Sequence, residues 1–252
     1  MKFQGRGRIY IAERNNSGVP GIFKFVGCAD AFNVSLSVET IQHFSKCTSA
    51  DALDYQGTKS QSAEVSMTLS EWVKNNILLA LRAVEVPDTT SGSVSNEACG
   101  SGFEAGDVYL LGSVNGTPRT NVSSVTVEDT GGPLTLNTDY TLNADTGAIT
   151  FVTTPSGAVT ADYTYDDLPY ASMFRAGQKD FWVRFDGVNK SDGDNPVVVD
   201  LYKVQFNPAS NLDLLSDELA LIELSGAVLV DDNKSEAGDM GQFGRMTLLE
   251  AA

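Results

Sequence analysis

The chain has 252 residues, of which 42% are hydrophobic, and this is enough for a sizeable packed core. Its 33 acidic and 17 basic residues give a formal net charge of −16, so most of the surface repels nucleic acid and anionic lipid. This balance excludes a tight nucleic-acid-binding protein. One histidine and three widely spaced cysteines exclude a standard zinc site and argue against a disulfide framework.

We therefore expect no bound metal and no cofactor. The longest apolar run, Ile77 to Leu81, is too short to span a membrane, and the first residues lack the apolar stretch of a signal peptide. We expect neither feature in this chain.

The first elements along the chain are short strands. Residues 8–12 and 22–26 are apolar apart from Arg8 and Lys24, and the segment between them is rich in turn-forming Asn, Gly and Pro. Two longer strands follow at residues 33–40 and 61–69, where apolar residues alternate strictly with small polar or acidic ones. We expect Val34, Leu36, Val38, Val65, Met67 and Leu69 on the core side. The other side then carries Ser35, Ser37, Glu39, Glu64 and Ser66.

Between these strands, Ser45 to Ser60 is polar and too long for a tight turn, which predicts a long loop of the kind that is often functional. After the second strand, Ser70 is placed to cap a helix. Its apolar face is expected to comprise Val73, Ile77, Ala80, Leu81 and Val84.

The middle of the chain differs in composition. Residues 88–168 contain 11 acidic residues and one basic residue, Arg119, whereas the remainder contains 22 and 16. Short strands are predicted here at 107–111, 122–127, 140–142, 149–152 and 159–165. We predict an inserted all-β domain, Ig-like or similar, at residues 87–169, which interrupts a discontinuous core domain of residues 1–86 and 170–252.

Alternation returns after residue 173. Lys203 and Gln205 oppose apolar Tyr202, Val204 and Phe206, and Glu223 and Ser225 oppose Ile222 and Leu224. The fold class is therefore mainly β, with one flanking helix.

Several segments resemble the tail tube proteins of long-tailed bacteriophages. The motifs that carry the resemblance are residues 25–33, 62–69 with the helix after them, 187–189, 192–194, 197–206, 214–219 and 241–244. The match as a whole covers most of both core segments, about two-thirds of the chain. The insertion, through residues 125–129, 139–140 and 147–149, resembles small β decorations of virion proteins.

The resemblance implies a tail-tube β-sandwich or barrel subunit that forms hexameric rings, which stack into a hollow tube. Double-stranded DNA passes through the tube without specific binding, and the partners are further copies, a tape measure protein, a tail terminator and baseplate or tip proteins. The location is the virion tail, after assembly in the host cytoplasm.

On this interpretation the polar sides of the strands line the lumen, because hydroxyls and carboxylates give a phosphate backbone no counterion release. The assigned residues are Ser35, Ser37, Glu39, Glu64, Ser66, Lys203, Gln205, Glu223 and Ser225. Alternation alone favours an ordinary solvent-facing sheet surface, and the resemblance is what favours the lumen. The loop from Ser45 to Ser60 is assigned to contact with the next ring, through Asp51, Leu53, Asp54, Tyr55 and Lys59; a plain surface loop is the alternative.

A second class of function is a carbohydrate- or receptor-binding β module. In that case aromatic side chains of the insertion form an exposed patch, and the candidates are Tyr109, Tyr140, Tyr163, Tyr165 and Tyr170. We do not expect an enzyme, because no nucleophile or carboxylate motif surrounds His43 at a recognisable spacing.

Overall fold

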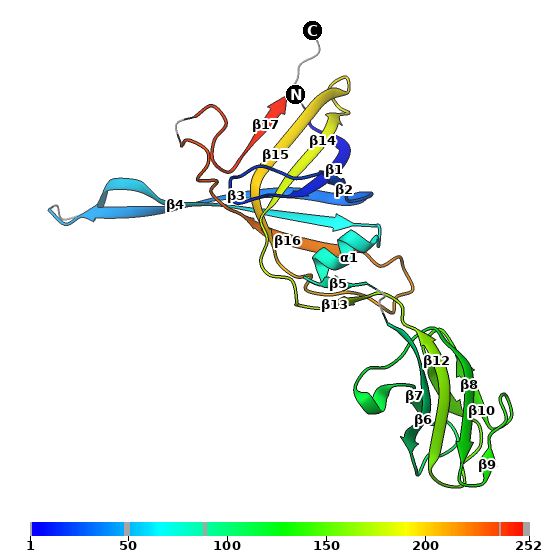
Figure 1. The fold of residues 1–252 in the computed structure, drawn as a ribbon. Coiled ribbons are helices and arrows are strands. Elements are labelled where there is room, and N and C mark those ends of the chain that lie inside the picture. Colours follow the sequence, from blue (N-terminus) through cyan, green and yellow to red (C-terminus); the bar gives the residue numbers. More distant parts are fainter. Residues whose placement is uncertain (1, 48–50, 88–89, 237, 249–252) are drawn as a thin grey trace. The chain divides into compact units, whose positions relative to one another are not determined.

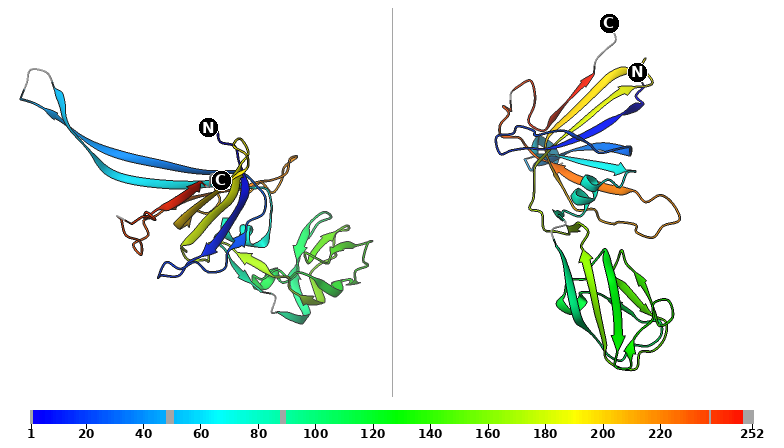
Figure 2. Two further views of the ribbon diagram at one scale, coloured as in Figure 1. Left: turned by 90° about the horizontal axis from the view of Figure 1, so that it is seen from above. Right: turned by 45° about the vertical axis from the view of Figure 1, so that its right-hand side comes forward.

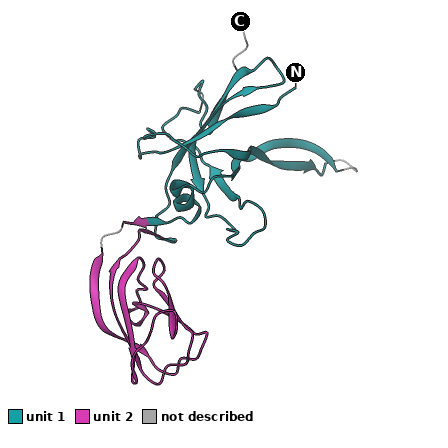
Figure 3. Ribbon diagram, turned by 90° about the vertical axis from the view of Figure 1, so that its right-hand side faces the viewer, with its two compact units in different colours: residues 1–84, 172–252 teal, residues 85–171 magenta. Residues whose placement is uncertain are grey.

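The computed structural model describes residues 2–47, 51–87, 90–236 and 238–248 (Figure 1). The chain is mainly β with one α-helix, as predicted. It divides into two compact units, residues 1–84 with 172–252 (unit 1) and residues 85–171 (unit 2), as coloured in Figure 3. These bounds differ by two residues from the domain boundaries expected from composition.

Unit 1 is built on one branched antiparallel sheet of eight strands. Its strands run in the order β2 (Lys24–Phe25), β1 (Gly5–Glu13), β14 (Phe181–Asn189), β15 (Asn195–Phe206), β16 (Ile222–Val228), β4 (Ala52–Leu69) and β3 (Ala29–Ser45). The branch is at β15, which pairs with β17 (Gly244–Leu248) along its first half and with β16 at its end.

Alternate residues of the central strands form the core of unit 1. Val65, Met67 and Leu69 of β4 are almost fully buried, and their partners Ile222 and Leu224 of β16 lie beside them in register. The period of two predicted for these strands is therefore confirmed, because one face of the sheet is covered. Burial of each such side chain stabilises the fold by roughly 1.5–3 kcal/mol.

The helix of unit 1 is shorter than predicted. α1 spans Lys74–Ala80, and Ser70 does not cap it, because the Ser70 hydroxyl donates to the carbonyl oxygen of Cys28 instead (3.0 Å). Val73 and Val84, expected on the apolar face, are each 39% exposed. The face that packs inward carries Asn76, whose side-chain amide donates to the carbonyl oxygen of Val26 (2.7 Å).

Unit 2 consists of two antiparallel sheets around a core of their own. One has the order β6 (Ser91–Gly100), β12 (Val159–Asp166), β8 (Val122–Asp129) and β9 (Gly132–Pro133); the other has the order β10 (Tyr140–Asn143), β11 (Ala148–Phe151) and β7 (Val108–Leu110). A short 3-10 helix, η1 (Ser113–Asn115), follows β7. The sequence analysis did not anticipate β6, whose Ser- and Gly-rich composition carries little strand signal.

The chain enters unit 2 through β5 (Val84–Val86) and leaves it through β13 (Tyr170–Ser172), and these two strands pair with each other. Unit 2 is thus an insertion that is joined to unit 1 through two adjacent strands. Among the described residues, no helix has the length and apolar character needed to cross a membrane.

Candidate assembly surfaces

Strands β3 and β4 continue as a long hairpin beyond the rest of the sheet of unit 1 (Figures 1 and 2). Their pairing runs from Ala29 with Leu69 out to Ser45 with Ala52. We call residues 36–47 and 51–62 the arm. At 3.3 Å per residue it extends roughly 30 Å.

The arm corrects the prediction of a loop from Ser45 to Ser60. Residues 52–60, including Leu53, Asp54, Tyr55 and Lys59, belong to β4 and pair with β3; Asp51 lies just before β4 and is exposed. Periodicity did not reveal this strand because both of its faces are exposed, so no apolar face marks it. Two irregularities in register, next to Thr40 and Phe44, further interrupt the pattern.

Large apolar side chains of the arm are exposed. Leu36 is 79% exposed and Val38 57%, although both were expected in the core, and Val34 at the base of the arm is 37% exposed. Toward the tip the exposed apolar residues are Ile41, Phe44, Leu53 and Tyr55. The strand prediction for residues 33–40 is confirmed, but the predicted burial of its apolar face is wrong, because no described residue of unit 1 covers that part of the hairpin.

The outer edge of β3 is unpaired within the described chain, since β4 is its one neighbour in the sheet. This edge is 17 residues long. An edge of such length presents a row of free backbone donors and acceptors, which soluble proteins normally keep short, charged or covered.

Polar side chains of the arm pair with one another. Lys59 donates to Glu39 (2.7 Å), as does the Ser60 hydroxyl (3.1 Å), and these hydrogen bonds lower the pKa of Glu39. The His43 ring nitrogen Nδ1 lies 2.6 Å from the Asp54 carboxylate. Glu39, assigned to the lumen, and Lys59, assigned to the next ring, thus form a single exposed ion pair.

Strand register brings the predicted polar residues onto one face of the sheet. Ser35 lies opposite Glu64, and Ser66 opposite Ser225, so that β3, β4 and β16 each contribute. We call this surface the polar face; it comprises Ser35, Ser37, Glu64, Ser66, Glu223 and Ser225, all exposed, with Lys203 and Gln205 of β15, which are half-buried. The core lies on the opposite side of the same strands.

Asp180 is a member of the polar face that the sequence analysis missed. Gln205 donates its side-chain amide to Asp180 (2.7 Å), and the Lys203 ammonium lies 4.0 Å from the same carboxylate. Asp180 offsets the one positive charge assigned to this face. Its position just before β14 gave no alternation signal, because the strand begins at the next residue.

Comparison with known proteins assigns the chain to a family. The family model described as Protein of unknown function UCP028589 matches residues 2–247. The chain belongs to this family. No curated protein matches it. Among the described residues of this family member, no group of three or more His, Cys, Asp or Glu side chains is placed to hold a metal ion.

The tyrosines of unit 2 do not form the exposed aromatic patch that a sugar-binding module requires. Tyr109, Tyr140 and Tyr163 of this family member are buried in the core of unit 2. Tyr165 is half-buried, with the Arg119 guanidinium 4.1 Å from its ring centre, and Tyr170 is exposed on β13. The prediction of a joint exposed patch is wrong, because aromatic residues on a small sandwich are needed to fill its core.

Proposed function

We propose that this protein is the tail tube subunit of a long-tailed bacteriophage, a structural protein that assembles into stacked rings with a DNA-wide lumen. The observation that carries this proposal is the arm. Its exposed apolar side chains and the open edge of β3 form a surface that is complete only when another polypeptide covers it.

The simplest polypeptide to cover the arm and the open edge of β3 is another copy of the same chain. If β3 pairs with an edge strand of a neighbouring copy and the ring closes, no free edge remains, as in a barrel. The arm, about 30 Å long, then reaches beyond its own subunit to a neighbour in the same or the next ring.

The polar face supports the lumen part of the proposal. It combines hydroxyls with the carboxylates of Glu64, Glu223 and Asp180 and a single ammonium, that of Lys203, which lies beside Asp180. Such a surface gives DNA phosphates no cluster of cations to bind, and therefore lets the duplex pass. On this proposal the partners are the tape measure, terminator and baseplate proteins, and the location is the virion tail.

Negative-stain electron microscopy of the purified full-length chain tests the proposal. Hollow filaments of uniform diameter are expected, and a reconstruction is expected to place Glu64 and Glu223 on the bore. A chain that stays monomeric at every concentration, or filaments with these carboxylates on the outside, would contradict it.

A further inference from the structure

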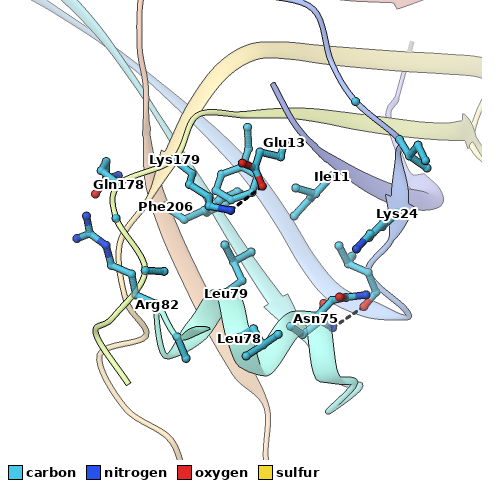
Figure 4. A pocket seen from close by; sticks show the side chains of 18 of the residues that line it. Ile11, Glu13, Lys24, Asn75, Leu78, Leu79, Arg82, Gln178, Lys179 and Phe206 are labelled. Atoms are coloured by element: carbon cyan, nitrogen blue, oxygen red, sulfur yellow. Dashed lines mark hydrogen bonds and ion pairs between the residues drawn. The ribbon is translucent and has the colours of Figure 1, made fainter. Parts of the chain in front are cut away.

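A cavity of about 430 Å³ opens on unit 1 beside α1 (Figure 4). Its lining comes from β1, β2, α1, the segments that follow β1, β2 and α1, the residues before β14, and one residue each of β14 and β15. Most of the lining is apolar and includes Ile11, Leu78, Leu79, Phe181 and Phe206. A cavity of this size is in the range that takes a small ligand or several side chains of a partner. We call it the α1 pocket.

Positive charges surround the α1 pocket. Lys179 pairs with Glu13 (2.8 Å), whereas no ion pair among the described residues uses Lys24 or Arg82. Figure 4 shows Lys24 and Arg82 on opposite sides of the pocket. An occupant that combines apolar side chains with acidic ones therefore matches the pocket in both shape and charge.

Arg82 is held in an unusual backbone conformation. Its φ is 48°, in the left-handed region that residues other than glycine rarely adopt. A non-glycine residue in this region is a local strain, and such strain concentrates at binding and switch positions. The side chain that the strained backbone holds is one of the two unpaired cations of the pocket.

A complementary segment lies elsewhere on the same unit. Residues 213–219, between β15 and β16, form what we call the leucine loop. Leu214, Leu215 and Leu219 are 78%, 98% and 92% exposed. Asp217 and Glu218 lie between these leucines and take part in no ion pair among the residues the structure describes.

We propose that the leucine loop of one copy of this chain occupies the α1 pocket of a second copy. Leucine side chains of the loop then cover the apolar lining, and Asp217 and Glu218 face Arg82 and Lys24. The inference rests on the proposed self-assembly and names one contact within it.

The arm matches the pocket less well than the leucine loop does. Of its three acidic side chains, Glu39 and Asp54 already pair within the arm, with Lys59 and His43, which leaves Asp51. The leucine loop offers two adjacent carboxylates without ion pairs among the described residues, next to three exposed leucines, and so matches the two cations of the pocket better than the arm does.

The contact has a consequence for symmetry. The α1 pocket and the leucine loop are different surfaces of one chain, so a loop-in-pocket contact is heterologous and leaves one free pocket and one free loop on every pair. Repetition of such a contact produces a closed ring or an open filament, which is the form of assembly that a tube subunit needs.

A charge exchange in the full-length chain tests the contact. One variant combines Lys24→Glu with Arg82→Glu, a second combines Asp217→Lys with Glu218→Lys, and a third carries all four changes. A control for the first variant, Lys2→Glu with Arg6→Glu, makes the same change in net charge as that variant, but on exposed residues outside the pocket lining. Sedimentation velocity over a concentration series measures self-association, circular dichroism checks folding, and negative-stain microscopy records the form of the assembly.

Self-association about tenfold or more weaker in each of the first two variants is expected, together with recovery in the fourfold variant and no change in the control. Unchanged association in the folded pocket variant, or no recovery in the fourfold variant, overturns the inference.

If the wild type forms tubes and the pocket variant forms them equally well, the contact is wrong and the tube proposal stands. If the wild type forms discrete oligomers that follow the expected pattern, the contact stands and the tube proposal fails. A wild type that remains monomeric overturns both.

Discussion

The backbone N–H of Arg82 donates to the carbonyl oxygen of Leu79 (3.1 Å) and closes the end of α1. The next N–H, that of Ala83, donates to the carbonyl oxygen of Leu78 (2.8 Å). This pair of bonds is the Schellman arrangement, in which the residue at the position of Arg82 is usually a glycine. Arginine stands there with a φ of 48°.

Replacement of Arg82 by glycine is expected to separate stability from assembly. Glycine adopts this conformation without steric strain, although it also gains freedom in the unfolded chain. The free energy of unfolding of Arg82→Gly should therefore be unchanged or up to about 1 kcal/mol higher. Self-association should fall, because a cation of the α1 pocket is lost. Urea denaturation and sedimentation velocity measure the two quantities; a variant that is less stable than the wild type would contradict the strain argument.

Glu97 is expected to be the main polar support of unit 2. Its side chain is buried and accepts hydrogen bonds from the hydroxyls of Tyr109 (2.7 Å) and Tyr163 (2.5 Å) and from the N–H of Gly112 (2.8 Å). Burial, together with the bond to Glu97, raises the pKa of Tyr109 to about 12. Glu97→Ala leaves three buried donors without an acceptor and should lower the stability of unit 2 by about 3 kcal/mol.

Hydrogen exchange of the amides of β6 and β12 in the full-length chain measures this loss. Exposed Glu104 provides the control, since Glu104→Ala should change the exchange of the same amides by no more than about 0.5 kcal/mol. Equal protection in the two variants would show that the Glu97 network adds nothing to stability.

The sequence predicted the strands best where the fold covers one face of them. The alternation at residues 61–69 and 222–228 corresponds to buried Val65, Met67 and Leu224, because these side chains meet the core of their own chain. The same alternation at residues 33–40 predicted a strand correctly and its burial wrongly, since Leu36 and Val38 have no cover within the described part of the chain. The alternation of residues in a sequence indicates that one face of a strand is apolar, but it does not indicate which polypeptide covers that face.

Other features had no local signal. Residues 52–60 of β4 are exposed on both faces, and β6 is rich in Ser and Gly, so neither segment has the apolar period of a strand. The α1 pocket combines residues from β1, β2, α1 and the segment before β14, which strand pairing brings together from distant parts of the sequence. The residues of the polar face could be predicted from the sequence because apolar and polar residues alternate within each of its strands. Asp180 could not, because it lies outside any strand.

The buried pair of Arg14 and Asp231 is expected to make the stability of unit 1 depend on acid. Arg14 donates to Asp231 (2.8 Å), and both side chains are almost fully buried. Burial by itself raises the pKa of Asp231, but hydrogen bonds from Arg14 and Asn233 outweigh it, and the pKa lies below its ordinary value of 3.8. Asp231→Asn leaves the Arg14 charge buried without a counter-ion and should cost about 3 kcal/mol at neutral pH.

The sign of the pH dependence follows from the lowered pKa. The ionised carboxylate stabilises the folded chain above pH 3.8, and this contribution is lost as the pH falls through the folded-state pKa. The difference in stability between wild type and Asp231→Asn should therefore be constant from pH 5 to pH 7 and become smaller below about pH 4. Urea denaturation at each pH measures it, and a difference that widens in acid would reverse the assignment.

Removal of the outer part of the arm is expected to abolish assembly without unfolding the subunit. Thr40 and Thr58 are paired in the hairpin, so residues 41–57 can be replaced by Asn-Gly, which favours a tight turn between antiparallel strands. The removed residues that the structure describes are exposed or, at Ser45 and Gly57, half-buried, and none belongs to the core cluster of unit 1. The free energy of unfolding should stay within about 0.5 kcal/mol of the wild-type value.

A pair of leucine substitutions provides the matched control for the arm. Leu36→Ala, at a side chain that is 79% exposed, should change stability by no more than about 0.5 kcal/mol and weaken assembly. Leu224→Ala, at a side chain that is 1% exposed, should cost about 2–5 kcal/mol. Thermal denaturation and negative-stain microscopy separate the two effects. Tubes of normal diameter from the shortened chain would show that the outer part of the arm is not the assembly surface, because a surface required for contact between copies cannot be removed without loss of the polymer.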